Sequence, residues 1–188
     1  MVPRLETPRL ELHPLELAYA AQIQLLFPKW EIVRFLATRV PWPYPADGAL
    51  AFCRDLALPA MERGDQWHWS LRLKSAPGQL IGCISLQKTE NENRGFWLGL
   101  PWHRQGLMSE AVEVVTAYWF DALGFPILRA HKAVLNIASR RISEKSGMRV
   151  VAVEERDYVG GRFPTETWEI TADEWRRRHA SPPPQYNL

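Results

Sequence analysis

Apolar positions recur along the chain with two different periods, and together they predict a mixed fold of strands and helices. Alternating or short continuous apolar runs predict strands over residues 9–14, 67–73, 80–87, 94–100, 128–135, 148–158 and 164–171. Helical spacing predicts helices over residues 15–27, from Asp47 onward, over 106–122 and over 137–146. The resulting order, β-α-α-β-β-β-α-β-α-β-β, indicates an α/β (α+β) fold in which a mixed sheet carries helices on both faces.

One stretch joins a strand, a turn and a helix in an arrangement that is typical of an anion site. Residues 95–98 are apolar, the run breaks at Pro101, and a polar turn with Arg104 and Gly106 leads into a strongly periodic helix. The first turn of a helix has unpaired N–H donors and the positive end of the macrodipole. Because glycine has no Cβ, a phosphate can approach the backbone closely. The pattern predicts a phosphate-bearing cofactor at the start of this helix.

The spacing in this turn is neither a dinucleotide fingerprint nor a P-loop. It resembles the pyrophosphate loop of the GNAT acetyltransferases, whose signature is Gln/Arg-x-x-Gly-x-Gly/Ala. His103, Gly106 and Met108 stand at the three signature positions, and only the glycine is retained. The long side chain of Met108 is expected to affect how tightly the phosphate cradle closes.

Four segments resemble, in the right order, those of the GNAT branch that includes the ribosomal-protein N-terminal acetyltransferases. They are the opening strand at 5–15, Gly-Phe-Trp-Leu at 95–98, Ser-Glu-Ala at 109–111, and Asn-Ile-Ala-Ser at 136–139 followed by Glu-Lys-Ser-Gly-Met at 144–148. The strand with Trp168 and the pair Glu174-Trp175 extend the similarity to about residue 175. The resemblance implies a mostly antiparallel GNAT sheet, acetyl-CoA as acetyl donor, and an amine acceptor, either a protein N-terminus or a small molecule.

The resemblance assigns ten residues to acetyl-CoA. Backbone N–H groups of residues 104–109 would bind the pyrophosphate, with a charge-assisted contact from Arg104, unless this is simply an exposed turn. Two strand residues would offer backbone to the pantetheine arm where the sheet splays, and Asn136 would bind the pantetheine, cap the following helix, or do both. The predicted set is Leu98, Leu100, His103, Arg104, Gln105, Gly106, Leu107, Met108, Ser109 and Asn136.

Acetyl transfer to an amine requires a thioester held beside the amine, a route for the amine proton, and a partner for the leaving thiolate. The resemblance implies that Ser139 serves the thiolate, although it could also be a solvent-facing helix residue. Many other relatives place a tyrosine acid where Ser143 stands here, so that role is vacant, and Tyr158 is a candidate substitute.

The general base is expected among four residues. Asn93 stands at the position where many relatives carry a glutamate, and Glu92 lies one residue away, which would face the other side of a regular strand. Glu155 and Asp157 lie near a second position, on the penultimate strand. Each carboxylate could equally be surface charge, and the base could act through water or be dispensable.

Four aromatic residues cluster in the proline-rich segment 28–46. They are Trp30, Phe35, Trp42 and Tyr44. Large apolar groups in such a segment must cover either core or ligand. The sequence therefore predicts either one wall of the acceptor cleft or a lid that packs on the core.

Composition and net charge bear on the number of domains, the possible partners and the cellular compartment. With 188 residues, 46% of them hydrophobic, the chain suits one domain over 1–175, followed by a basic helix end and a loose proline-rich tail over 176–188. A net charge of +2 gives no general attraction to nucleic acid or membrane.

The lack of an apolar leader or long apolar run, with cysteines only at Cys53 and Cys83, favours a cytoplasmic protein. The histidines lack metal-ligand spacing, so no metal is expected, and the many aromatic residues hint at a homodimer.

The sequence thus predicts an N-acetyltransferase that moves acetyl from acetyl-CoA to a primary amine by direct transfer in a ternary complex. The alternative is a catalytically degenerate relative that binds CoA as a sensor or scaffold. Met108 and Asn93 are the two residues that keep this alternative open.

Overall fold

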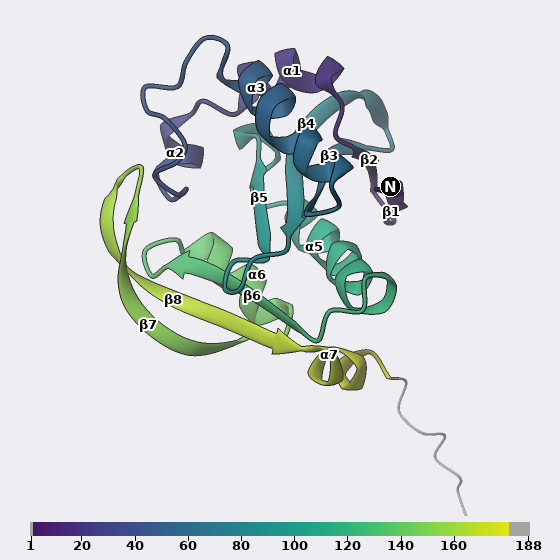
Figure 1. The fold of residues 1–188 in the computed structure, drawn as a ribbon. Coiled ribbons are helices and arrows are strands. Elements are labelled where there is room, and N and C mark those ends of the chain that lie inside the picture. Colours follow the sequence, from purple (N-terminus) through teal and green to yellow (C-terminus); the bar gives the residue numbers. More distant parts are fainter. Residues whose placement is uncertain (1, 181–188) are drawn as a thin grey trace, which may run out of the picture.

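The strands form two antiparallel sheets that meet along one line (Figure 1). A computed structural model describes residues 2–180. The first sheet has the order β1 (Leu5–Glu6), β2 (Leu10–Pro14), β3 (Gln66–Leu73), β4 (Ala76–Gln87) and β5 (Arg94–Leu98). The second sheet has the order β6 (Ile127–Ala133), β8 (Gly161–Thr171) and β7 (Arg149–Tyr158). The strand β7 is therefore an edge, and with β8 it forms a long hairpin that arches away from the body of the molecule.

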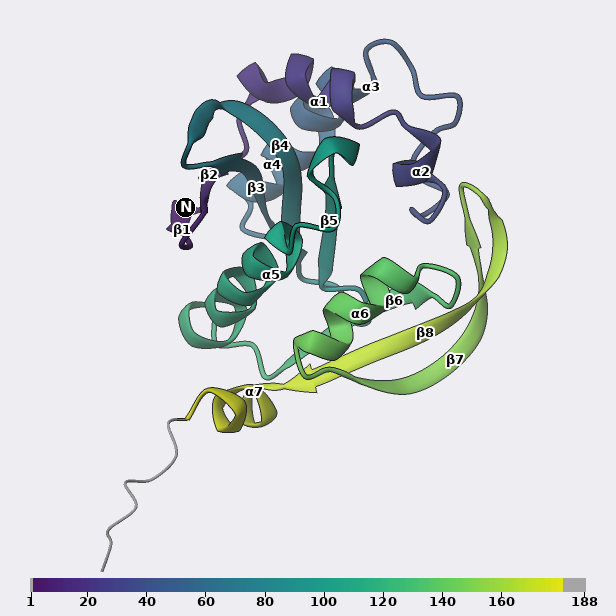
Figure 2. The same ribbon diagram turned by 180° about the vertical axis from the view of Figure 1, so that it is seen from behind.

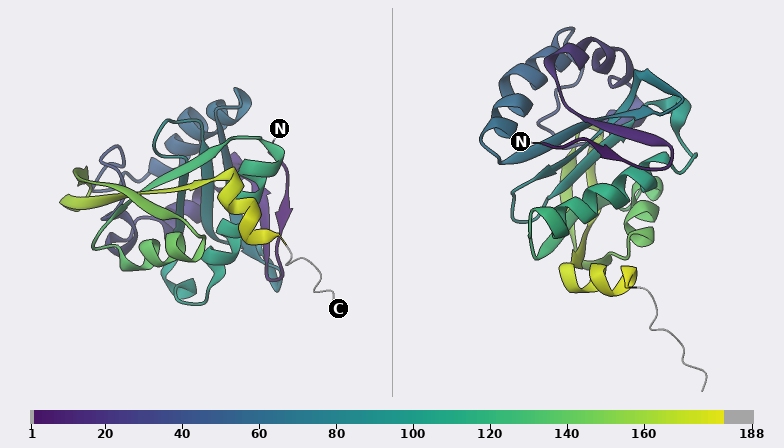
Figure 3. Two further views of the ribbon diagram at one scale, coloured as in Figure 1. Left: turned by 90° about the horizontal axis from the view of Figure 1, so that it is seen from below. Right: turned by 90° about the vertical axis from the view of Figure 1, so that its right-hand side faces the viewer.

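Helices cover both faces of the first sheet (Figure 3, right). Those before β3 are α1 (Ala20–Leu26), α2 (Trp30–Val33), α3 (Gly48–Ala51) and α4 (Leu58–Glu62). A π-type turn at Phe52–Ala57 joins α3 to α4 in one continuous coil. The later helices are α5 (Leu107–Ala117), continued by a second π-type turn at Tyr118–Ala122, then α6 (Ile137–Lys145) and α7 (Ala172–His179). Figure 2 shows α6 beside α5 and over the second sheet.

Two apolar clusters result from this layering. The larger cluster lies between the first sheet and α5 and continues to Leu128 and Ala130 of β6. Its centre is Trp69, which is fully buried and donates a hydrogen bond from Nε1 to Pro3 O at 2.7 Å. The smaller cluster lies on the opposite face, under α1 and α3. Each fully buried large side chain contributes roughly 1.5–3 kcal/mol relative to exposure.

The predicted elements occur in the predicted order, and the structure adds β1, α2 and α7 and shifts some element ends. The helix expected over 15–27 begins as a 3₁₀ turn at Leu17–Tyr19 and becomes α-helical only at α1, because Leu15 still bonds to the neighbouring strand through His68 O at 2.9 Å. The segment 28–46 contains the short helix α2. The basic residues 176–179 form the last turn of α7, whose negative dipole end suits positive charge. The predicted tail over 181–188 lies outside the described residues.

Candidate functional site

The strands β5 and β6 lie side by side at one end and then part. At the joined end, Asn93 N donates to Arg129 O at 2.7 Å, and Arg129 N donates to Asn93 Oδ1 at 2.7 Å. Beyond this joint β5 pairs only with β4, and β6 pairs only with β8. The facing edges of the two strands thus carry backbone polar groups that no strand of residues 2–180 pairs, and such groups need a partner.

The turn after β5 continues from the open end of this gap into α5. Gly106 precedes the helix with φ 77°, and a Cβ there would meet only Arg9 Nη2 at 3.5 Å. Arg104 also has a positive φ of 61°. Two side chains brace the turn, because His103 Nε2 lies 2.8 Å from Leu98 O and Gln105 Nε2 donates to Pro101 O at 3.0 Å. The exposed backbone in front of the first helical turn is therefore open to an anion.

The side chain of Met108 does not enter this turn. It is 6% exposed and belongs to the larger apolar cluster, as does Leu107. Only the backbone N–H groups of these two residues are available at the helix start, as they would be with a small residue at 108. The departure from the GNAT signature at this position therefore leaves the cradle open.

Arg9 reaches the same turn, although sequence reasoning did not include it in the site. Its Nη1 donates to Gln105 O at 3.0 Å, while its Nε and backbone N contact the Glu110 carboxylate at 2.7 and 2.8 Å. Thr7 Oγ1 also donates to that carboxylate. Although burial opposes it, these bonds from Thr7 and Arg9 hold the pKa of Glu110 below its ordinary value. The turn with Thr7 and Arg9 between β1 and β2 is thus bonded to the start of α5 at Glu110, a contact that no local sequence pattern reveals.

Two predicted residues lie at the start of α6. Asn136 Oδ1 accepts a hydrogen bond from Ser139 N at 3.3 Å, so Asn136 caps this helix. Ser139 is buried, and its hydroxyl has no hydrogen-bond partner among residues 2–180. One helical turn on, the Ser143 hydroxyl is sealed from solvent and also lacks a partner in the described part of the chain.

The base candidates separate into distinct environments. The Asn93 side chain is used up in joining the sheets, since its Oδ1 accepts from Arg129 and its Nδ2 donates to Gln87 O at 3.3 Å and to Thr89 O. Glu155 and Asp157 lie on β7, and both are exposed to solvent. These contacts suit Asn93 to a structural role and leave the two β7 carboxylates to solvent.

Glu92 instead meets a histidine across the joint. Its Oε2 lies 2.7 Å from His131 Nδ1 of β6, and Arg156 Nη1 of β7 lies 3.2 Å from the same nitrogen. Arg156 in turn binds Glu154 at 2.7 Å. Next to His131, on the other face of β6, the Lys132 ammonium lies 4.9 Å from the Phe96 ring centroid of β5. Four charged or titratable side chains, those of Glu92, His131, Arg156 and Lys132, therefore lie close to the β5–β6 joint.

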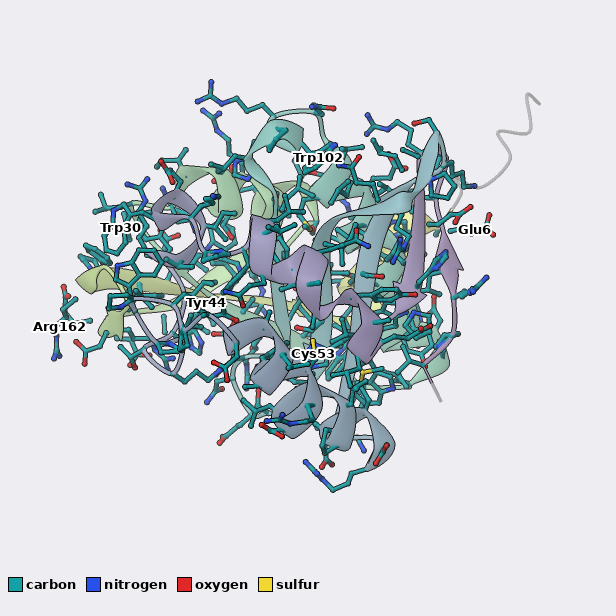
Figure 4. The ribbon with its side chains drawn as sticks, turned by 90° about the horizontal axis from the view of Figure 1, so that it is seen from above. Glu6, Trp30, Tyr44, Cys53, Trp102 and Arg162 are labelled. Atoms are coloured by element: carbon teal, nitrogen blue, oxygen red, sulfur yellow. The ribbon has the colours of Figure 1, made fainter. Side chains whose placement is uncertain are left out.

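The aromatic residues of segment 28–46 divide between surface and core. Trp30 and Trp42 pack on each other at 5.5 Å between centroids and are 42% and 43% exposed. Tyr44 packs edge-on against Phe27 at 5.1 Å, beside the smaller apolar cluster, and burial raises its pKa to about 12. Figure 4 shows Trp30 and Arg162 at the same end of the molecule, with Tyr44 further in.

This segment is fastened to the tip of the β7–β8 hairpin. Val159 N donates to Leu36 O at 3.0 Å, and the Phe35 ring meets Phe163 at 5.7 Å. Figure 1 shows the hairpin tip beside α2. Segment 28–46 and the hairpin together border the face of the second sheet that carries His131 and Arg156.

Residues 2–180 contain neither a membrane-spanning helix nor a metal-binding group. No helix within them has the length and apolar character needed to cross a bilayer. No group of three or more histidine, cysteine, aspartate or glutamate side chains there is arranged to hold a metal ion. Cys53 and Cys83 are free thiols whose pKa values are raised by burial.

Comparisons with known proteins agree with this geometry. The family model of the acetyltransferase (GNAT) domain matches residues 9–149, whereas a search of the curated proteins found no match. RimL, described as a ribosomal L7/L12 alpha-N-protein acetyltransferase in complex with coenzyme A, has a TM-score of 0.78 at 14% identity, over 92% of this chain and 99% of that one. A ribosomal-protein-S5-alanine acetyltransferase from Vibrio fischeri has a TM-score of 0.78 at 15% identity, over 92% and 98%.

A third structure with this fold is the microcin C7 self-immunity acetyltransferase MccE, in complex with acetyl-CoA and AMP. Its TM-score is 0.72 at 14% identity, over 87% of this chain and 93% of that one. Identities this low show a shared fold and leave the acceptor open. The predicted family, fold class and acetyl donor are confirmed. The chain belongs to the GNAT acetyltransferase family, whose members take acetyl-CoA as acetyl donor.

Proposed function

We propose that the chain transfers the acetyl group of acetyl-CoA directly to a primary amine within a ternary complex. The observation that carries this proposal is the parting of β5 and β6 beyond the Asn93–Arg129 joint, with an anion-binding turn at the open end. Two strand edges whose backbone groups lack a strand partner suit a linear chain that ends in a reactive group, and a helix start suits its phosphates. No covalent intermediate on the protein is needed.

The residues present fit acetyl-CoA. The open space at Gly106 and the inward direction of Met108 leave the backbone of residues 104–109 free for a pyrophosphate. The edges of β5 and β6 beyond the joint offer backbone groups to the pantetheine arm, apart from the Leu98 carbonyl, which meets His103, and the His131 amide, which donates to Glu92 Oε1 at 3.4 Å. When bound, acetyl-CoA supplies an activated acetyl group. The residues at the edges of β5 and β6 then act by holding the two reactants together. This positioning lowers the free-energy barrier of the transfer by several kcal/mol.

Two proton movements accompany transfer, and the chain has groups for each. The free, buried hydroxyl of Ser139 at the start of α6 is proposed to hydrogen-bond and protonate the leaving thiolate. The Tyr158 hydroxyl, considered as a substitute, is instead 2.9 Å from Thr165 Oγ1. On the opposite side, Glu92 and the groups around it are proposed to receive the amine proton.

The acceptor is proposed to approach from the side of segment 28–46. Phe35 there meets Phe163 of the hairpin, whose β7 strand carries Glu154, Glu155 and Asp157. Glu154 and Asp157 are balanced by Arg156 and Arg162, whereas Glu155 has no ion pair among residues 2–180, and its carboxylate favours an ammonium over a phosphorylated or strongly anionic acceptor. A peptide N-terminus and a small primary amine both satisfy this requirement.

The rival interpretation, a CoA-binding sensor without activity, rested on Met108 and Asn93. The Met108 side chain packs into the core and not into the cradle. Asn93 is a structural joint, and the carboxylate missing at its position is present one residue earlier at Glu92.

The test is thiol release from acetyl-CoA by the full chain over a panel of acceptors. Peptides with a free N-terminus and no lysine are compared with the same peptides already acetylated at the N-terminus, and small amines form a second arm. We expect thiol release that requires a free primary amine. Tight acetyl-CoA binding without release on any amine would support the sensor instead.

A further inference from the structure

His131 lies at the β5–β6 joint, on the face of the second sheet away from the main core. It follows Arg129, the last β6 residue that is bonded toward β5, by two positions. Leu128 and Ala130 point into the main apolar cluster with α5. Because side chains alternate along a strand, His131 lies on the face of the second sheet that points away from the larger apolar cluster. Segment 28–46 and the β7–β8 hairpin border this face, and we propose that the acceptor approaches along it.

The contacts of the ring decide which nitrogen carries the proton in neutral His131. The Glu92 carboxylate at 2.7 Å can only accept, so it requires a proton on Nδ1. Arg156 Nη1, at 3.2 Å from the same nitrogen, can only donate and favours the opposite form. The carboxylate contact is much the shorter, and Arg156 has Glu154 as another partner, so the contact with Glu92 prevails. The lone pair of the neutral ring then resides on Nε2.

Nε2 is free to use that lone pair. It has no hydrogen-bond partner among residues 2–180. It is also not sealed from solvent. The His131 side chain as a whole is only 5% exposed, so Nε2 is reached through a small opening.

We propose that His131 Nε2, with the ring oriented by Glu92, takes the proton from the acceptor amine; this role rests on the proposed function. His131 removes one proton from the ammonium, which frees the nitrogen lone pair to form the C–N bond to the acetyl carbon. The C–S bond breaks with its electron pair on sulfur. The nitrogen releases its second proton and the thiolate takes up one proton. The net products are the amide, the free thiol of CoA and one proton to solvent.

The charged groups around His131 form a balanced set. Glu92 approaches from the segment before β5, Arg156 and its partner Glu154 approach from β7, and Lys132 follows on β6. The Glu92 carboxylate lies against the ring, while the Arg156 guanidinium is already paired with Glu154. Glu92 is thus a positioning residue in this proposal, and the catalytic group is His131.

The test uses two histidine variants that each lose a histidine–glutamate pair. His131→Gln removes the proposed catalytic group, whereas His13→Gln removes a histidine whose Nε2 lies 3.0 Å from Glu11 on β2. We expect kcat/KM for the amine to fall about a hundredfold or more in His131→Gln, within the usual range for base catalysis. Acetyl-CoA affinity should change less than threefold in both, and His13→Gln should keep its activity. Equal activity of His131→Gln and the wild type would overturn the proposal.

A second readout needs no turnover. In ¹⁵N spectra of histidine-labelled protein near pH 8, without acetyl-CoA, we expect the His131 ring to carry its proton on Nδ1, and Glu92→Gln to shift population toward the Nε2–H form. Glu92→Gln should also lower kcat/KM by about tenfold. An Nε2–H tautomer in the wild type would overturn the role of His131. If the wild type itself releases no thiol with any amine, the proposed function fails, and this role fails with it.

Discussion

The strands β3 and β7 differ in where their side chains lie, and this difference separates the part of the molecule that stabilises the fold from the part beside which we propose that the chemistry occurs. In the first sheet, β3 is buried at every position from Trp67 to Arg72. In the second sheet, the edge strand β7 is exposed at every position from Arg149 to Glu155. The strand β3 lies in a sheet that is covered on both faces, whereas β7 presents Glu154 and Arg156 beside His131.

The largest expected contrast is in stability. Trp69→Ala opens a cavity in the main core and removes the bond to Pro3 O, so the free energy of unfolding should fall by about 3–5 kcal/mol. Val153→Ala on β7, where the side chain is 64% exposed, should change it by less than about 0.5 kcal/mol. Urea unfolding of both variants measures this contrast. Comparable losses would show that β7 is as much a part of the core as β3.

The second prediction places the donor at the turn before α5. Gly106→Val and Gly64→Val both force a branched residue to a positive φ, 77° and 70°, with no close neighbour at the new Cβ. The two variants should lose similar thermal stability. At about 100 times its dissociation constant, acetyl-CoA stabilises a binding protein by roughly 2.7 kcal/mol. Thermal shift assays should find this gain in Gly64→Val and not in Gly106→Val; a gain in both would place the phosphates elsewhere.

The third prediction concerns the thiolate. Ser139→Ala removes a hydroxyl that has no internal partner, and the turnover number should fall by about tenfold to a thousandfold. Ser146→Ala at the other end of α6 removes a hydroxyl that donates to Ile142 O at 2.8 Å, and its turnover should stay near that of the wild type. Acetyl-CoA affinity should be unchanged in both. Equal turnover in the two variants would discard the role of Ser139.

The smallest expected effect is a pH dependence at the joint. Burial, opposed by Glu92 and reinforced by Arg94, lowers the pKa of Lys132 from 10.5 to about 8. Below pH 8 the folded chain bears the full cost of the buried charge, and between pH 8 and 10.5 stability rises because only the unfolded state holds that proton. Lys132→Met should therefore raise Tm at pH 7 by about 2–4 °C, the effect of about 1 kcal/mol.

That gain in Tm should shrink toward pH 10, where wild-type Lys132 has lost its proton in the fold. Differential scanning calorimetry of both proteins at each pH measures the difference, in which the other titrating groups cancel. A gain that stays constant with pH would mean that the Lys132 ammonium is well solvated.

The fold was predictable because its signals are local. Apolar alternation in Trp67–Leu73 and helical spacing in Leu107–Tyr118 depend only on near neighbours along the chain. The same holds for the glycine at 106, whose positive φ follows from its place before a helix.

The site was predictable only in part because its decisive contacts join distant residues. Arg9 meets Glu110 across 101 positions, and Glu92 meets His131 across 39. Asn93 could not be recognised as a joint without β6 beside it. The direction of Met108 likewise depends on which face of α5 meets the sheet.

The most direct test of the central claim, that acetyl-CoA lies between β5 and β6, is amide hydrogen exchange with and without acetyl-CoA. The account predicts slower exchange at 94–98, 130–133 and 106–110, where backbone groups face the gap or the turn, and unchanged exchange in the paired strands β2 and β3. Bound acetyl-CoA that leaves all three segments unchanged would contradict the account.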